Sequence, residues 1–222
     1  MVNRKKTVAL IVTTLLVWVS VHSALAFKGF YISDFTLPPR GFIAIVPPMI
    51  AIALTLFLLW RSRYMQQLSL QSMTYIQTFR FPLELIVFTA FFEAGNIPDV
   101  MTFYGANPDI IVGITAPIVA YLYFSRKVVS YKVLLAWNII CLGMLINISS
   151  IAILSLPYPF QQFGLNQPNV ALLNFPFVLL PCGLVAIAYF CHFMSIHKLL
   201  VFKDNQTEVQ NKPPNTKLEF EK

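Results

Sequence analysis

Residues 133–155 read VLLAWNIICLGMLINISSIAILS, a stretch of 23 residues without a charged side chain. A transmembrane helix needs about 20 mostly apolar residues, because each residue advances about 1.5 Å through a hydrocarbon core about 30 Å thick. This stretch is long enough and apolar enough to span a bilayer. It predicts that the chain is an all-α membrane protein.

The composition of the whole chain supports the same class. Of its 222 residues, 57% are hydrophobic and only 11% are charged, and the mean hydropathy is +0.69. Soluble domains carry about 25% charged residues. The composition therefore excludes a water-soluble globule, a disordered chain and a disulfide scaffold. The net charge of +7 is scattered between apolar blocks, which argues against a nucleic-acid partner. The expected partner is the lipid bilayer, with a membrane-protein partner or a homo-oligomer left open.

Comparable apolar stretches recur and predict a polytopic bundle of about six transmembrane helices. Five of them are almost free of charge, whereas the third is apolar only from Phe81 onward. The expected spans are residues 7–27, 41–60, 74–92, 109–124, 133–155 and 170–195. We expect residues 1–202 to form one transmembrane helical domain and the polar residues 203–222 to form a disordered cytoplasmic tail.

Two segments allow a second interpretation. The mixed polar and apolar residues 63–81 could lie along the inner interface or begin one long tilted helix. Residues 1–26 combine basic residues, an apolar stretch and a final Ala-Leu-Ala, as a cleavable signal peptide does. Because the apolar stretch continues to Phe27, a retained helix is favoured, with cleavage as the alternative.

The placement of Lys and Arg predicts the orientation. If the N-terminus is cytoplasmic, only Lys28 and Arg40 fall outside. Ten basic residues then fall inside: Arg4, Lys5, Lys6, Arg61, Arg63, Arg126, Lys127, Lys132, Lys198 and Lys203. Basic residues concentrate on the cytoplasmic side of membrane proteins. We therefore expect both termini in the cytoplasm and the chain in a cell membrane.

The third expected span holds the strongest polar signal, Arg80 and Glu84 on either side of Pro82. Their i,i+4 spacing puts both side chains on one helix face, where each could neutralise the other. Counted from Thr74, Glu84 lies about 15 Å deep, near the bilayer midplane. Pro82 removes a backbone donor and should kink the helix. Intramembrane ionisable residues mark substrate or proton sites, and a structural ion pair is the equal alternative.

Three asparagines in the last two spans complete the candidate substrate or proton site. Asn138, Asn147 and Asn174 could line a polar cavity with Arg80 and Glu84. Their alternative role is interhelical hydrogen bonding. The uncharged loop 157–169, with Tyr158, Phe160 and Phe163, is expected to anchor at the membrane interface and less readily to cover such a cavity.

A second polar cluster follows the third span in the outer loop. It comprises Glu93, Asn96, Asp99, Asn107 and Asp109. Carboxylate and amide oxygens suit hard cations, but the spacing matches no calcium loop, so a solvated acidic loop is the favoured interpretation. Asn107-Pro108-Asp109 reads as an N-cap, a first-turn proline and an acid at a helix N-terminus.

Neither a cofactor nor a metal site is expected. The three cysteines, Cys141, Cys182 and Cys191, lie inside apolar runs and form no CxxC pair, which favours a packing role. His22 is expected near the outer end of its span, and His192 and His197 near the inner end of theirs, so His22 cannot share a haem with either of them. His192 and His197 are five residues apart and do not share a helix face, so a bis-histidine haem is not expected. No sequence pattern indicates catalytic residues.

These features favour a small-solute or ion carrier, permease-like, with a midplane polar site. Phe81-Pro82 and Phe175-Pro176 are offset by 94 residues, which hints at two inverted halves, as in some transporters. The alternative is a non-catalytic scaffold or accessory subunit of a membrane complex. An enzyme acting on lipid is less favoured.

Short motifs in the middle of the chain carry a resemblance to known proteins. They are residues 80–84 (RFPLE), 101–109 (MTFYGANPD), 137–138 (WN), 157–159 (PYP) and 174–176 (NFP). Their order resembles a group of uncharacterised small bacterial integral-membrane proteins. The resemblance implies a location in the bacterial inner membrane and supplies neither a reaction nor a ligand.

Overall fold

The computed structural model describes residues 4–60, 62, 67–88, 92–102 and 104–211. Within these ranges the fold is all-helical, with no β-strand. Three helices are long and apolar enough to cross a membrane: Ala9–Phe27, Tyr131–Leu154 and Leu180–Val201. Phe42–Leu58 and Asp109–Ser125 are shorter apolar helices. The chain is therefore an all-α protein whose helices suit a membrane.

The helices follow one another with turns and loops between them. In chain order they are α1 (Arg4–Phe27), α2 (Phe42–Leu59), α4 (Leu70–Tyr75), the 3-10 helix η1 (Ile76–Phe79), α5 (Arg80–Pro82), the π-helix η2 (Leu83–Phe88), the 3-10 helix η3 (Asp99–Met101), α7 (Asp109–Ala120), the π-helix η4 (Tyr121–Ser125), α8 (Tyr131–Leu154), the 3-10 helix η5 (Ala171–Leu173), the π-helix η6 (Leu180–Leu184) and α9 (Val185–Asn211). Helices thus occupy the first, second, fourth and fifth expected spans to within a few residues.

The segment from Leu70 to Phe88 is one continuous run of α, 3-10 and π turns. It begins at Ser69, whose Oγ accepts a hydrogen bond from the Ser72 amide at 3.1 Å. The long-helix interpretation therefore holds from Leu70 onward, while residues 63–66 lie outside the described residues. The π-helix η2 starts directly after Pro82, because proline supplies no amide for the normal α-helical bond and disturbs the ladder around it.

The last expected span begins ten residues later than predicted, at Leu180 instead of residue 170. The preceding residues form turns and a short 3-10 helix, in which Asn174 Nδ2 donates to the Val170 carbonyl at 2.8 Å and Asn169 Oδ1 accepts the Leu172 amide at 3.4 Å. Pro176 consequently lies in a turn, whereas Pro82 lies inside a helix, so the two Phe-Pro pairs occupy different structures. At its other end α9 stays helical to Asn211, and residues 212–222 of the expected tail lie outside the described residues.

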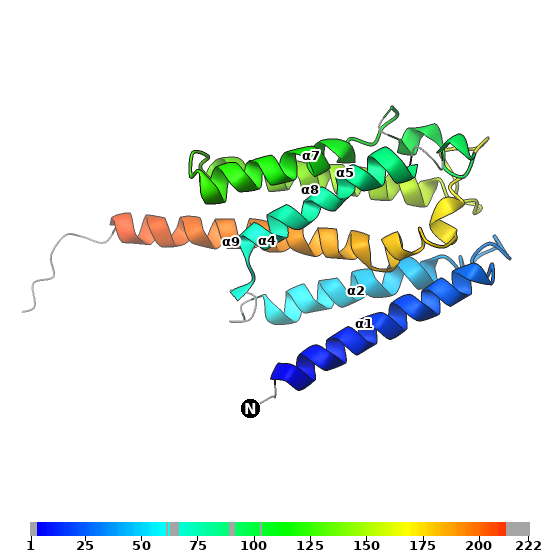
Figure 1. Ribbon diagram of the computed structural model, residues 1–222, viewed down its shortest axis with the longest axis horizontal. Coiled ribbons are helices and arrows are strands. Elements are labelled where there is room, and N and C mark those ends of the chain that lie inside the picture. Colours follow the sequence, from blue (N-terminus) through cyan, green and yellow to red (C-terminus); the bar gives the residue numbers. More distant parts are fainter. Residues whose placement is uncertain (1–3, 61, 63–66, 89–91, 103, 212–222) are drawn as a thin grey trace, which may run out of the picture.

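In the bundle α9 lies between two groups of helices (Figure 1). It packs along α2 on one side and along α8 and α4 on the other, and α7 packs against α8, α5 and η1. The loops that follow α1, η2 and α8 gather at one end of the bundle. The start of α1, the connection from η4 to α8 and the end of α9 lie at the other end.

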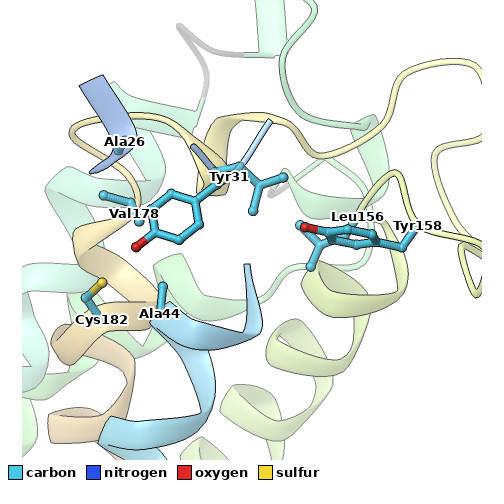
Figure 2. Close-up of a cluster of buried hydrophobic side chains, with 8 residues drawn as sticks. Ala26, Tyr31, Ala44, Leu156, Tyr158, Val178 and Cys182 are labelled. Atoms are coloured by element: carbon cyan, nitrogen blue, oxygen red, sulfur yellow. The ribbon is translucent and has the colours of Figure 1, made fainter. Parts of the chain in front are cut away.

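The loop-rich end is closed by contacts between loops. The Asn96 carbonyl accepts the amides of Val170 and Ala171, each at 3.0 Å. Tyr158 is only 3% exposed, and its hydroxyl accepts the Gly41 amide at 3.1 Å. Figure 2 shows the rings of Tyr31 and Tyr158 among this end's buried apolar side chains. The expected membrane anchor at Tyr158 is therefore wrong, because its ring packs inward beneath the loops.

Candidate functional site

A buried ion pair joins the third helical segment to α7. Arg80 Nη1 lies 3.3 Å from Asp109 Oδ1, and the two residues are 1% and 5% exposed. The expected Arg80–Glu84 pair does not form; within the described part of the chain Arg80 makes its one ion pair with Asp109. Asp109 is the first residue of α7, so its carboxylate also lies at the favourable end of the helix dipole.

A close approach of two helices makes this pair possible. Gly113 lies one turn after Asp109 on the same face of α7. A Cβ on Gly113 would overlap the backbone of Phe81, 2.7 Å from its Cα. The same face continues with the buried Ala116 and Ala120. Small residues let helix backbones approach closely, and here they bring Asp109 within reach of Arg80.

Glu84 bonds to the loop before α7. Its Oε2 accepts a hydrogen bond from Asn107 Nδ2 at 2.6 Å. The same amide nitrogen donates to the Met101 carbonyl at 2.9 Å, and Asn107 Oδ1 accepts the Asp109 amide at 3.1 Å. Asn107 therefore fixes Glu84, the loop and the first residue of α7 together, although Pro108 and not Asn107 occupies the N-cap position of the helix.

A cavity of about 250 Å³ adjoins these side chains. Its wall is mostly apolar, and its polar lining comprises Arg80, Glu84, Asp109, Ser149, Ser150 and Tyr189. The apolar lining comes from α2, α8, α9, the loop after α8 and the short helices η1, η2, η3, η5 and η6, and it includes Ile45, Met49, Phe79, Met101, Leu145, Ile148, Leu156 and Leu172. A mostly apolar concavity with a few convergent polar groups is the usual form of a small-molecule site.

The cavity lies in the loop-rich half of the bundle. Asp109 is the first residue of α7 and Asn107 precedes it, so the charged side chains lie level with that end of α7. The lining residues Met101 and Leu172 belong to the short helices η3 and η5 within the connecting segments at that end, and Leu156 follows α8. Arg80 pairs with the residue that begins α7 instead of Glu84, whereas the predicted position of Glu84 near the bilayer midplane stays a prediction.

The charges of the site do not balance when every group is ionised. Arg80 contributes one positive charge, while Asp109 and Glu84 contribute two negative charges. Asp109 already neutralises Arg80. Glu84 is 2% exposed and forms no ion pair within the described ranges. A buried lone carboxylate is costly, so Glu84 requires a proton or another cation.

The three expected asparagines are absent from the lining of the cavity. Asn138 Oδ1 lies 3.1 Å from His192 Nδ1 and joins α8 to α9. Asn147 donates to the Ala106 carbonyl at 2.8 Å, and Asn174 donates to Val170 within its own turn. The alternative role of interhelical hydrogen bonding is confirmed for Asn138 alone, since Asn147 bonds to a loop and Asn174 bonds within its own turn.

The expected outer-loop cluster divides into two parts. Asn107 and Asp109 are buried with Arg80 and Glu84, whereas Glu93 and Asp99 are exposed. Asn96 holds the loop through its own backbone and through a 3.3 Å bond to the Ala94 carbonyl. The described residues contain no group of three or more His, Cys, Asp or Glu side chains that could hold a metal ion.

Two features of the site escaped prediction from the sequence. Ser149 and Tyr189 line the cavity but lie inside uniformly apolar spans, where neither residue type is distinctive. The Arg80–Asp109 pairing could have been predicted in part from the sequence. Asp109 begins an apolar stretch, and Arg80 is a cation inside another apolar stretch that needs a carboxylate partner.

No family model, curated protein or solved structure matches the chain. The resemblance to small bacterial membrane proteins stays a prediction. The functional argument consequently rests on the geometry of the cavity and its charged wall.

Proposed function

We propose that this protein is a six-span membrane carrier that binds a small solute in the cavity beside Arg80, Glu84 and Asp109. The observation that carries the proposal is Glu84, a buried carboxyl on the cavity wall without an ion-pair partner in the described part of the chain. A group that only locked helices together would be expected to have its charge satisfied. A carboxyl left unpaired beside a cavity suits a bound solute or proton.

The proposed membrane arrangement has both termini in the cytoplasm and the loop-rich end outside. The even number of crossings agrees with the start of α1 and the end of α9 lying at the same end of the bundle (Figure 1). The sequence carries half of its Lys and Arg side chains in residues 4–6, 61–63 and 126–132, and this favours the end with both termini as the cytoplasmic one. In a bacterial inner membrane, the cavity would then lie in the outer half of the bundle.

A carrier of this kind would couple solute movement to a proton at Glu84. The test uses protein reconstituted in vesicles that contain a pH-sensitive dye. Three small aromatic solutes serve as probes: benzyltrimethylammonium, phenylacetate and benzyl alcohol. We expect at least one of them to alter the decay of an imposed pH gradient or, if the probe is neutral, to bind with measurable affinity.

The Glu84→Gln variant should lose this response because it cannot exchange a proton. The exposed Glu93→Gln variant is the matched control and should behave like the wild type. If no probe binds, and Glu84→Gln changes only thermal stability, the carrier proposal fails. A stoichiometric partner that copurifies with the protein would then favour the scaffold or accessory subunit.

A further inference from the structure

We infer that the solute is a small apolar monocation, such as a substituted ammonium ion, which competes with a proton for Glu84. This inference rests on the proposed function and specifies its substrate class. Arg80 and Asp109 form a neutral pair, which leaves the charge of the site to Glu84. One positive charge is needed to balance an ionised Glu84, and either a proton or a monovalent cation supplies it.

The groups that face Glu84 limit what else could balance it. The titratable or charged groups that line the cavity together with Glu84 are Arg80 from α5, Asp109 from α7 and Tyr189 from α9. The lining residues from α2 are apolar, and those from α8 add only Ser149 and Ser150 as polar groups. Arg80 is held by Asp109, so within the described residues no side-chain cation remains for Glu84.

The rest of the lining suits the apolar body of such a cation. The ring-bearing residues Phe79 and Tyr189 line the cavity together with the thioethers of Met49 and Met101. Aromatic faces attract cations, and methionine adapts to irregular apolar shapes. Because most of the wall is apolar, a strongly hydrated inorganic ion would lose its water shell without replacement ligands.

A competing feature is Arg80 Nη2, which is buried and has no hydrogen-bond partner. It could donate to an anionic solute. An anion would add a negative charge to a site where the guanidinium is already neutralised, so it would have to bring a proton with it. The charge count favours the cation, and the two cases predict opposite proton movements.

The exchange step is balanced in atoms and charge. The O–H bond of the protonated Glu84 carboxyl breaks, and its proton passes to water. The resulting carboxylate forms an ion pair with the entering ammonium ion. No covalent bond to the solute forms, and no group is oxidised or reduced.

The experiment measures protons during binding. Purified full-length protein in weakly buffered detergent solution is titrated with benzyltrimethylammonium while a pH dye records the proton change. We expect one proton released per cation bound when Glu84 is protonated. In buffered titrations, the apparent affinity should fall about tenfold per pH unit on the acidic side, since proton and cation compete.

Variants separate this inference from the proposed function. Glu84→Gln should bind no benzyltrimethylammonium and release no proton, Glu84→Asp should restore part of both, and Glu93→Gln should match the wild type.

If phenylacetate or benzyl alcohol binds and the cation does not, the cation inference is wrong while the carrier proposal stands. Proton uptake instead of release on binding would also overturn it. Failure of all three probes to bind would overturn both. The pH dependence of wild-type affinity needs no variant and tests the inference even if Glu84→Gln fails to fold.

Discussion

Arg80 and Asp109 lie 29 positions apart, yet their side chains meet at 3.3 Å in the interior. Breaking a buried ion pair by removing one partner typically costs about 3–5 kcal/mol because it leaves an uncompensated charge. We expect Arg80→Ala and Asp109→Ala each to lower the free energy of unfolding in mixed micelles by about that amount. The double variant should lose much less than the sum of the two.

A double-mutant cycle with unfolding in mixed micelles measures this coupling. Glu93→Ala, an exposed carboxyl in the nearby loop, serves as the control and should change stability little. Losses in the double variant that equal the sum of the single losses would show that the two side chains do not interact.

The hydrogen bonding of Asp34, in the loop between α1 and α2, predicts how the stability of the protein depends on pH. The Thr36 amide donates to Asp34 Oδ1 at 2.9 Å, and this hydrogen bond, helped by Arg40, lowers the pKa of the Asp34 carboxyl below its ordinary value of 3.8. A pKa lowered by folding adds stability above the unfolded pKa, and that stability is lost as the pH falls through the folded pKa. Asp34→Asn should remove this dependence.

The measurement is a carbon-13 NMR titration of the Asp34 carboxyl, followed by thermal unfolding of both proteins between pH 6 and the acid limit. The melting temperature of the wild type should exceed that of Asp34→Asn near pH 6, and this difference should disappear only below about pH 4. A carboxyl that titrates at or above its ordinary pKa would refute the assigned hydrogen bond.

At the residue scale the sequence identified the buried charges but assigned the wrong partner. The i,i+4 rule pairs Arg80 with Glu84 because it considers one helix at a time. The structure instead uses a tertiary contact to Asp109, which depends on the Gly113 approach. Local spacing contains no information about which neighbouring helix comes within hydrogen-bond distance.

At the element scale, the contact between α5 and α7 depends on Gly113. A methyl group there would overlap the Phe81 backbone, and overpacking costs about 1–3 kcal/mol or more. We expect Gly113→Ala to lower the melting temperature in detergent and to weaken solute binding, because it moves Asp109 away from Arg80.

Gly143 provides a matched control on α8. A Cβ at Gly143 meets no atom within 4 Å, and alanine favours a helix by about 1 kcal/mol over glycine. Gly143→Ala should therefore keep or raise the melting temperature. Equal effects of the two substitutions would show that α7 and α5 are not in close contact.

The helices themselves were largely predictable, since apolar length determines where a spanning helix can form. The main error in a boundary lies between residues 170 and 180, where hydropathy stays high but Asn174 and Pro176 form turns. Hydropathy measures transfer into lipid and is insensitive to turn chemistry. The change to π-helix after Pro82 follows from the missing amide, although its exact form depends on packing.

At the scale of the whole molecule, the six-span arrangement predicts which loops face the cytoplasm. The chain has three cysteines, all of them buried, and replacing them gives a cysteine-free background for the test. We expect a single cysteine at Gln162 to react with an impermeant thiol reagent added outside intact cells. A cysteine at Lys127 should react only after the membrane is opened. Labelling of position 127 from outside, or protection of position 162, would contradict the topology.

The membrane class was predictable from composition because few soluble folds tolerate so little charge. The cavity was not predictable, since its wall is assembled from residues of five α-helices and several short 3-10 and π-helices that lie far apart in the sequence. Each of those stretches looks like an ordinary apolar span on its own.

The most direct test of the central claim is carbodiimide labelling of Glu84. Dicyclohexylcarbodiimide dissolves in membranes and adds to protonated carboxyls, so mass spectrometry of the digested protein identifies the residue it modifies. The proposed site predicts an adduct on Glu84, which benzyltrimethylammonium suppresses, while Asp109 stays unmodified because its carboxyl is paired with Arg80. An adduct on Asp109 instead of Glu84, or no adduct on Glu84, would contradict a protonated Glu84 on the wall of a solute-accessible cavity.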